Sequence, residues 1–113
     1  MASVFWFSKL KAGAQAAAYE RWVQETDYRL AQDIESVLHY RVHRLAGPVE
    51  GEGEAPYDYI EVLEVTEIDA YRSALKDHPA IQQIIAEIGQ FIEGAGSAWG
   101  DPIAPLGKER SMD

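Results

Sequence analysis

The order in which two hydrophobic periodicities alternate is the feature that most constrains the fold of this chain. Segments 4–11, 37–45 and 57–65 are rich in aromatic and β-branched residues, which is typical of β-strands. Segment 14–34 instead carries apolar residues at the three- and four-residue spacing of an amphipathic helix. The glycine, proline and glutamate residues of segment 46–56 predict a solvated loop. The first half of the chain therefore predicts a strand, a helix, a strand, a loop and a strand.

The second half of the chain begins with two predicted helices. Thr66 and Asp69 have the three-residue spacing of a capping box, which predicts the start of a short helix. His78–Pro79 should end that helix, and Pro79 suits the first position of a new one. One stripe of the new helix is formed by Ile81, Ile84, Ile85, Ile88 and Ile92.

Glycines then predict the end of that helix, at Gly94 and Gly96. Segment 97–106, which is interrupted by Pro102 and Pro105, predicts an irregular last strand. The complete order of strand, helix, strand, strand, helix and strand is that of an α+β, ferredoxin-like βαββαβ fold. We therefore expect a four-stranded antiparallel sheet with both helices on one face.

The other face of this sheet has no predicted cover. Segments 4–7 and 59–65 are apolar at both alternating sets of strand positions, so an uncovered face would expose a large aromatic patch. Soluble monomers rarely expose such a patch. We therefore expect a homodimer in which two sheets pair face to face.

Composition limits the classes of function. The chain has 113 residues, a formal net charge of −9 and a pI near 4.7, which disfavour binding to nucleic acid or to a membrane surface. It contains no cysteine and only three histidines, so we expect no disulfide, no thiol catalysis and no metal site. The lack of a long apolar run and of a signal-peptide pattern indicates a cytoplasmic protein. We expect one domain over residues 1–106, followed by a C-terminal tail over residues 107–113.

Four segments in this order resemble the REDY-like (HapK) family, a branch of the dimeric α/β barrel superfamily: "FSKLKAG", "YERWVQETDY", "ESVLHYRVHR" and "EAPYDYIEVLEVTEIDAYR". The resemblance covers roughly residues 4–92. It implies a ferredoxin-like dimer, a dimeric α/β barrel, that acts in the bacterial secondary metabolism of pyrrole or indole pigments. It also implies cofactor-independent condensation or cyclisation, with the ligand between the helices and the sheet of each protomer.

The strand positions with fewer charges should face the helices. This set comprises Val4, Trp6, Ser8, Leu10, Leu38, Tyr40, Val42, Tyr57, Tyr59, Glu61, Leu63 and Val65. The opposite positions of segment 37–45 hold His39, Arg41 and His43, which we call the basic row. Such a row could form a catalytic or anion-binding site, but cross-strand pairing with Asp58 and Glu64 is a sufficient structural reason for it. We therefore assign the basic row to the dimer side of the sheet.

Two acids are the candidate catalytic residues. Asp27 lies within roughly 40° of the centre of the apolar stripe on the first helix, and Glu61 is the one acid among the helix-facing positions of its strand. Carboxylates that share an apolar pocket acquire different pKa values, so one is protonated and the other ionised near neutral pH. Such a pair can perform general acid and base catalysis without a cofactor. A tyrosine hydroxyl or backbone amide could instead satisfy each acid, or a local rotation could carry Asp27 to the wet edge of the stripe.

Inward-facing residues of the strands and the first helix are candidates for substrate binding. Trp6, Tyr40 and Tyr59 could stack on a small, flat aromatic substrate, although aromatic residues at such positions are often only core residues. Ser8 and Val23 share these inward faces and complete the set on the strands and the first helix.

His78 is a further candidate because superfamily members often carry a His-Pro pair at the pocket rim, and it could instead cap or pack the following helix. Plant polyketide cyclases of this fold resemble "His-Pro-Ala-His" there, whereas Ile81 replaces the second histidine in this chain, which argues against an identical aldol mechanism. Trp22 and Glu25 match the family segment but lie off the apolar stripe, so we expect a surface or interface role for both.

These features predict a cofactor-independent cyclase or condensing enzyme that acts on a pyrrole- or indole-type intermediate. A cofactor-free monooxygenase of the same fold is the alternative among enzymes. A non-catalytic protein that binds and protects an unstable intermediate is the alternative outside them.

Overall fold

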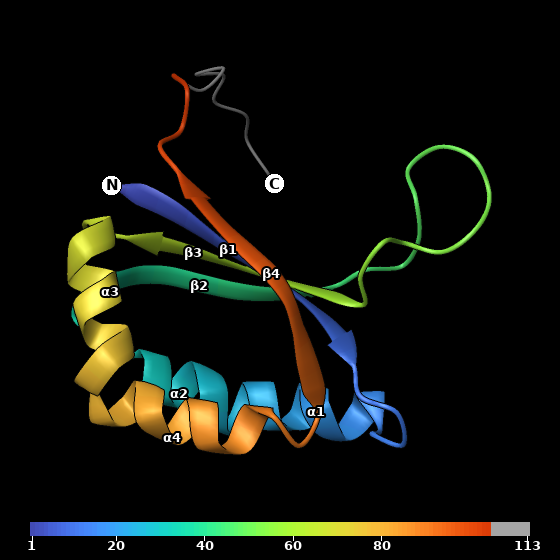
Figure 1. Cartoon of the computed structure of the whole chain (residues 1–113), viewed down its shortest axis with the longest axis horizontal. Helices are drawn as coiled ribbons and strands as arrows, with labels where there is room; N and C mark the ends of the chain where they lie inside the picture. Colours follow the sequence, from blue (N-terminus) through green and yellow to red (C-terminus); the bar gives the residue numbers. More distant parts are fainter. Residues whose placement is uncertain (105–113) are drawn as a thin grey trace, which may run out of the picture.

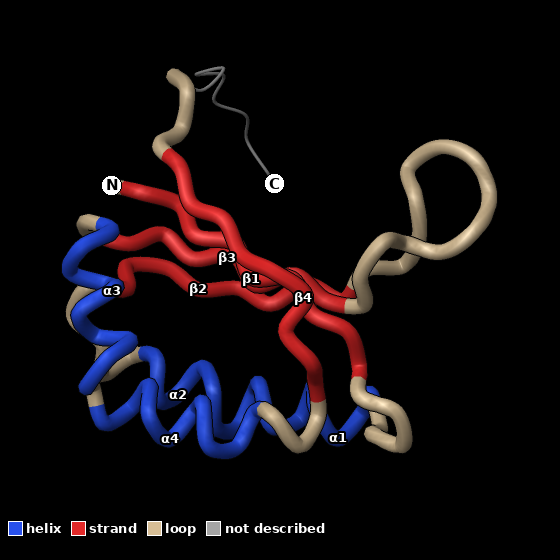
Figure 2. The backbone as a smooth tube through the Cα atoms, in the orientation of Figure 1, coloured by secondary structure: helices blue, strands red, loops and turns tan. Residues whose placement is uncertain are grey.

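The computed structural model describes residues 1–104 and has the predicted ferredoxin-like fold (Figure 1). Four antiparallel strands form one sheet in the order β2-β3-β1-β4. The helices lie on one face of this sheet, and no helix formed by residues 1–104 covers the other face (Figure 2). The elements are β1 (Ala2–Leu10), α1 (Ala16–Trp22), the π-helix η1 (Val23–Asp27), α2 (Tyr28–Ala31), β2 (Val37–Arg44), β3 (Tyr59–Val65), α3 (Ile68–Asp77), α4 (Pro79–Ile88) and β4 (Ile92–Gly100).

Strand β3 shows which positions face the helices. Burial alternates strictly along it, with Tyr59, Glu61, Leu63 and Val65 buried and the intervening residues half-buried. On the neighbouring strand β1, Trp6 lies opposite Glu61 and therefore shares its face. The predicted assignment of helix-facing positions is thus correct within β3 and for Trp6. It was wrong for Tyr57, which precedes β3 and packs its ring against Phe7 on the uncovered face, with 4.9 Å between the centroids.

Strand β2 departs from the predicted alternation at one position. A register shift places Val37 opposite Val65 and His39 opposite Glu64, so Leu38 is an extra residue in a β-bulge. Val37 packs against the core, whereas Leu38 is 52% exposed. The prediction that Leu38 faces the helices was therefore wrong, because the bulge changes the alternation before Tyr40.

The basic row is exposed on the face without helices, as predicted. Its expected ion pairs are absent from the part of the chain that the structure describes. Asp58 instead accepts a 2.7 Å hydrogen bond from the backbone N–H of Leu10, and Glu64 accepts hydrogen bonds of 3.2 Å from the hydroxyl of Ser3. The basic row therefore remains free for contacts outside the protomer.

The predicted first helix consists of three consecutive pieces. Its central piece, η1, is a π-turn in which the backbone N–H of Tyr28 donates to the carbonyl of Val23, five residues earlier. π-turns inserted in α-helices are rare and occur frequently at functional sites. This one ends at Asp27, and the turn was not predicted from the sequence.

The predicted capping box was wrong, because α3 begins at Ile68 after Glu67 and has no side-chain cap. The end of the last helix was also misplaced. Helix α4 stops at Ile88, and Ile92 already belongs to β4. Pairing with β1 along the edge of the sheet extends the strand through glycines that locally favour turns.

Strand β4 ends before Pro102, so the predicted interruption by proline does not occur within it. Pro105 and the predicted boundary between residues 106 and 107 lie outside the described residues. Among residues 1–104, no helix combines the length and the apolar character needed to cross a membrane.

Candidate functional site

A cavity of about 420 Å³ lies between the helices and the sheet. Helix α4 forms its apolar wall through Ile81, Ile84, Ile85 and Ile88. These isoleucines share one side of α4 because they recur at three- and four-residue intervals. The predicted stripe of the last helix thus lines a cavity rather than only packing on the sheet.

Polar groups converge on this cavity from three elements. Asp27 comes from the end of η1, Glu61 from the centre of β3 and Ser8 from the end of β1. Their exposed fractions are 1%, 9% and 3%, respectively. One oxygen of each side chain, Asp27 Oδ1, Glu61 Oε1 and Ser8 Oγ, is buried without a hydrogen-bond partner in the protein. Since buried polar atoms are normally hydrogen-bonded, three such atoms on one cavity indicate a ligand site.

Tyr40 of β2 connects to this polar group. Its hydroxyl donates a 2.5 Å hydrogen bond to Asp27 Oδ2. The ring of Tyr28 packs edge-on against the ring of Tyr40, with 5.3 Å between the centroids, and so helps to hold it in place. One oxygen of Asp27 is therefore fixed by the protein while the other stays available to a ligand.

The two carboxyl groups have raised pKa values. Burial raises the pKa of Asp27 to about 6, although the hydrogen bond from Tyr40 opposes this shift. Burial and then the negative charge of Asp27 raise the pKa of Glu61 to about 8, again opposed by Tyr40. Because the ionised form is penalised most at Glu61, the pair holds one proton and one negative charge near pH 7.

Aromatic residues form the remaining wall close to the acids. Trp6 Nε1 donates a 3.0 Å hydrogen bond to the hydroxyl of Tyr71 on α3, and both side chains line the cavity. Burial raises the pKa of Tyr71 to about 12, so its hydroxyl keeps its proton as a donor at neutral pH. Sequence reasoning missed Tyr71. The signal for it was the spacing of Ile68, Tyr71 and Leu75 along one side of a predicted helix.

The predicted site residues thus fall into two groups. The cavity brings together Asp27, Glu61, Trp6, Ser8 and Tyr40. It does not include Val23, Tyr59 or His78 among its lining residues.

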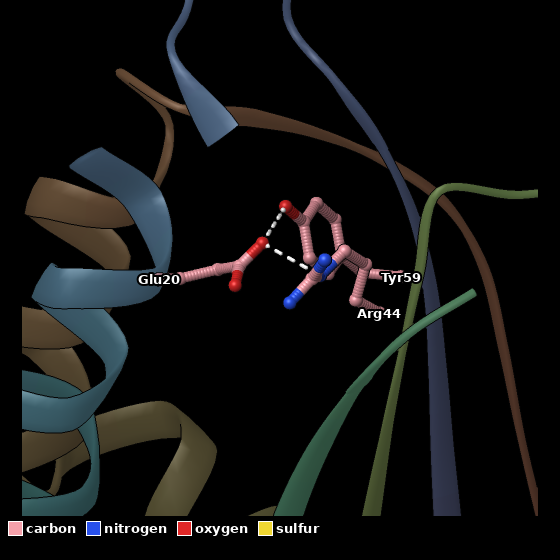
Figure 3. A network of polar contacts seen from close by, with 3 residues as sticks. All are labelled: Glu20, Arg44 and Tyr59. Carbon is pink, nitrogen blue, oxygen red and sulfur yellow. Dashed lines mark hydrogen bonds and ion pairs between the residues drawn. The ribbon is translucent and has the colours of Figure 1, made fainter. Parts of the chain in front are cut away.

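Val23 and Tyr59 lie in a neighbouring part of the core, where they pack with Tyr19. The hydroxyl of Tyr59 donates a 2.9 Å hydrogen bond to Glu20 Oε2, which also forms an ion pair of 3.1 Å with Arg44 (Figure 3). This network links α1 to the ends of β2 and β3. It therefore lies beside the cavity and not within its lining.

His78 has the capping role that was considered for it. Its Nδ1 accepts a 3.1 Å hydrogen bond from the backbone N–H of Ala80 in the first turn of α4, and its Nε2 lies 3.1 Å from the carbonyl oxygen of Asp33. Nδ1 is the acceptor, so the proton on the ring is at Nε2, which donates to that carbonyl. His78 lines a separate groove beside α3.

Trp22 is buried, so the expectation of a surface or interface role was wrong for this residue. Its ring packs against Phe91, and its Nε1 donates a 2.9 Å hydrogen bond to Glu87 on α4. The first helix therefore buries a wider face than its apolar stripe suggested, because α4 covers one side of it. Glu25 is exposed as expected.

The donor set of the cavity contains two carboxylates and a serine hydroxyl. Within residues 1–104, no group of three or more histidine, aspartate or glutamate side chains is placed to hold a metal ion. The arrangement can accept a proton at the carboxylate of Asp27 and donate a proton from the carboxyl group of Glu61.

Comparison with solved structures gives related folds over nearly the whole chain. The crystal structure of HapK from Hahella chejuensis has a TM-score of 0.78 and 26% sequence identity, covering 98% of this chain and 100% of that one. SnoaB from Streptomyces nogalater, described as a cofactor-independent oxygenase, has a TM-score of 0.69 and 14% identity, covering 95% and 97%. A dimeric ferredoxin-like protein from Thermobifida fusca has a TM-score of 0.69 and 16% identity, covering 89% and 90%. At their low identities, the last two show a common fold alone.

A search of curated proteins found no match. The comparison with family models did, and it agrees with the resemblance seen in the sequence. The family described as REDY-like protein HapK matches residues 2–103, which include every residue that lines the cavity. The chain therefore belongs to the REDY-like HapK family.

Proposed function

We propose that this protein is a cofactor-independent cyclase or condensing enzyme that acts on a pyrrole- or indole-type intermediate in bacterial secondary metabolism. One observation carries the proposal: two buried carboxyl groups each present an unpartnered oxygen to a largely apolar cavity. An ordinary core would satisfy these oxygens within the protein. Membership of the HapK family and a fold shared with an oxygenase that needs no cofactor support an enzymatic role for the cavity.

The proposed chemistry uses the two acids in different protonation states. Asp27, whose charge is supported by the Tyr40 hydroxyl, removes a proton from the carbon of the substrate that acts as nucleophile. That carbon forms a bond to a carbonyl carbon, and Glu61 delivers its proton to the carbonyl oxygen. The product carries a new carbon–carbon bond and a hydroxyl group. Proton exchange with water then returns Asp27 and Glu61 to their starting states.

The aromatic residues would orient the substrate. Trp6 is fixed by its hydrogen bond to Tyr71, and Tyr40 by its bond to Asp27, so their rings offer rigid surfaces for a flat ring system. A volume of about 420 Å³ lies within the usual range for small-molecule sites. Substrate stacking against these two rings is therefore part of the proposal.

Replacement of the acids by their amides tests the proposal. Asp27→Asn and Glu61→Gln keep the shape of each side chain and remove its proton transfer, so each should lower the chemical rate by roughly a hundredfold or more. Ligand affinity should change much less. Glu25→Gln, an exposed change in η1, is the matched control and should leave the rate unchanged. A cyclisation can leave the mass unchanged, so the product is examined by NMR as well as by mass. If the ligand leaves the protein with an unchanged structure under all conditions, the protein binds and protects its ligand and the proposed catalysis is wrong.

A cofactor-free monooxygenase is the second candidate, and the fold shared with SnoaB favours it. Its reaction would consume dioxygen and add oxygen to the ring system. An oxygen electrode distinguishes the two enzymatic functions, because condensation consumes no dioxygen. Product mass gives an independent answer.

We also propose that the protein forms a homodimer through the uncovered face of its sheet. That face carries the half-buried side chains of Phe5, Phe7, Ile60 and Val62, which form an apolar patch on a protein with a high charge. A dimeric ferredoxin-like protein of the same fold supports dimer formation. Sedimentation that gives a monomer at micromolar concentration would contradict it.

A further inference from the structure

The unpartnered atoms of the cavity have one chemical character. An ionised carboxylate accepts hydrogen bonds and cannot donate them. Asp27 carries the negative charge of the pair near pH 7, so its free Oδ1 only accepts; the protonated carboxyl group of Glu61 keeps one carbonyl oxygen that accepts, and Ser8 Oγ can accept as well. A ligand that satisfies these atoms must bring hydrogen-bond donors to them.

The charge of the lining points in the same direction. Among the described residues, the cavity is lined by two acidic side chains and by no lysine, arginine or histidine. The ion pair described above, between Arg44 and Glu20, belongs to the network beside the cavity. Nothing in the lining therefore compensates a negatively charged ligand, while the carboxylate pair leaves one negative charge without a counterion.

We propose that the cavity selects ligands with a protonated, N–H-bearing nitrogen, and that this nitrogen sits between Asp27 and Glu61. The proposal deepens the function given above and rests on it for the location of the substrate site. A protonated amine, imine or aza-aromatic ring would supply both the positive charge and the donors. A ligand whose recognised end is a carboxylate or a phosphate is excluded.

The surroundings of the acids favour the same ligand chemistry. Trp6 and Tyr40 place aromatic rings at the cavity near the carboxylates, and aromatic faces attract cations. The isoleucines of α4 can take the apolar part of the ligand on the other side. The cavity is thus divided into a cation-binding end and an apolar end.

Three probes with the same indole ring and the same two-methylene spacer test this inference at pH 7: tryptamine is a cation, tryptophol is neutral and indolepropionate is an anion. Isothermal titration calorimetry should show that tryptamine binds most tightly and indolepropionate least. We expect a difference of roughly 10- to 100-fold between these two, because a hydrogen bond to a charged group contributes about 1.5–3 kcal/mol.

Variants show whether the acids cause the preference. In the double variant Asp27→Asn/Glu61→Gln, the difference between the cation and the anion should largely disappear. Glu25→Gln removes one exposed carboxylate of the same helix and should retain the preference. A preference that survives in the double variant would mean that the overall negative charge of the protein causes it, and the inference would be wrong.

The wild-type series is decisive without any variant. Equal or tighter binding of indolepropionate overturns the inference, and so does the absence of tryptamine binding at millimolar concentration. Because these experiments involve no turnover, their result is independent of the proposed catalysis. A preference for the cation in a protein that never alters a ligand would retain this inference and reject the enzymatic function.

Discussion

The Tyr40 hydroxyl donates to Asp27 Oδ2 over 2.5 Å, while Glu61, the other acid of the cavity, has one oxygen with no partner. This bond makes the two carboxyl groups unequal. It favours the ionised form of Asp27, and the resulting charge disfavours ionisation of Glu61. This arrangement supports the proposed assignment of Asp27 as the base and Glu61 as the acid.

The rate of the proposed reaction should depend on pH with a maximum between two limits. Asp27 must be ionised, so kcat/KM should fall as the pH decreases below about 6. Glu61 must be protonated, so kcat/KM should also fall as the pH increases above about 8. The two limits belong to the coupled pair. A rate that rises continuously up to pH 10 would contradict the role of Glu61 as an acid.

Tyr40→Phe should move the acidic limit of this profile. The hydroxyl lowers the pKa of Asp27, so its removal should raise that pKa and shift the acidic limit to higher pH. Tyr40→Phe keeps the aromatic ring, so a role of Tyr40 in stacking alone would not produce such a shift. Tyr28→Phe is the control, because its hydroxyl bonds to the backbone N–H of Val42 and not to either acid. An unchanged profile in Tyr40→Phe would show that the hydrogen bond does not control the base.

The buried acids should also make stability depend on pH. Unfolded carboxyl groups have pKa values near 4, whereas Asp27 and Glu61 titrate at about 6 and about 8 in the folded protein. The folded state therefore binds more protons, and the contribution of these groups to the free energy of unfolding decreases from about pH 4 to about pH 8. The free energy of unfolding of Glu61→Gln, measured with urea, should thus exceed that of wild type by roughly 1–3 kcal/mol between pH 5 and pH 8. Glu25→Gln should show no comparable gain.

The sequence predicted the parts of the molecule that follow from periodicity. Alternation along β3 correctly placed Glu61 inside, and helical spacing correctly placed Asp27 there. It missed features that depend on backbone irregularities and on tertiary contacts. No particular residue type in the sequence indicates the π-turn that ends at Asp27 or the bulge at Leu38. The position of β4 was missed because its glycines form a strand only when β1 is present to pair with them.

The cavity itself could not be predicted, for a related reason. Periodicity identified the isoleucines of α4 as inward-facing but could not say whether they touch the sheet or stop short of it. Tyr71 lines the cavity because α3 approaches Trp6 at the far end of the sheet. That approach depends on the angle between the helix and the sheet, which no short segment encodes.

The proposed dimer should depend on the basic row. Arg41 is exposed on the uncovered sheet face and lies opposite Val62 in the register. Arg41→Glu would add negative charge to a patch on a protein that already carries a net charge of −9. We expect a weaker dimer in sedimentation equilibrium, while any dimer that remains keeps its activity. Intact assembly with abolished turnover would mean that the basic row belongs to the active site.

Access to the cavity should be controlled at Gly94. This residue of β4 lies opposite Ser8, so a side chain at position 94 would point to the same side as Ser8, into the cavity that both residues line. Its mouth lies here, because Gly94, Gly89 and Ile85 are the exposed residues of the lining. An added Cβ at Gly94 would meet no atom within 4 Å, so the fold should tolerate a larger residue.

Gly94→Leu should therefore weaken tryptamine binding several-fold or more and slow its association, with little change in Tm. Gly100→Leu is the matched control, because Gly100 lies opposite Ser3 on the other face of the sheet and an added Cβ there also meets no atom within 4 Å. It should bind tryptamine as wild type does. Stopped-flow association and thermal unfolding of both variants provide the comparison. If Gly94→Leu binds tryptamine at the wild-type rate, ligands reach Asp27 and Glu61 by another path, and the mouth is not formed between α4 and β4.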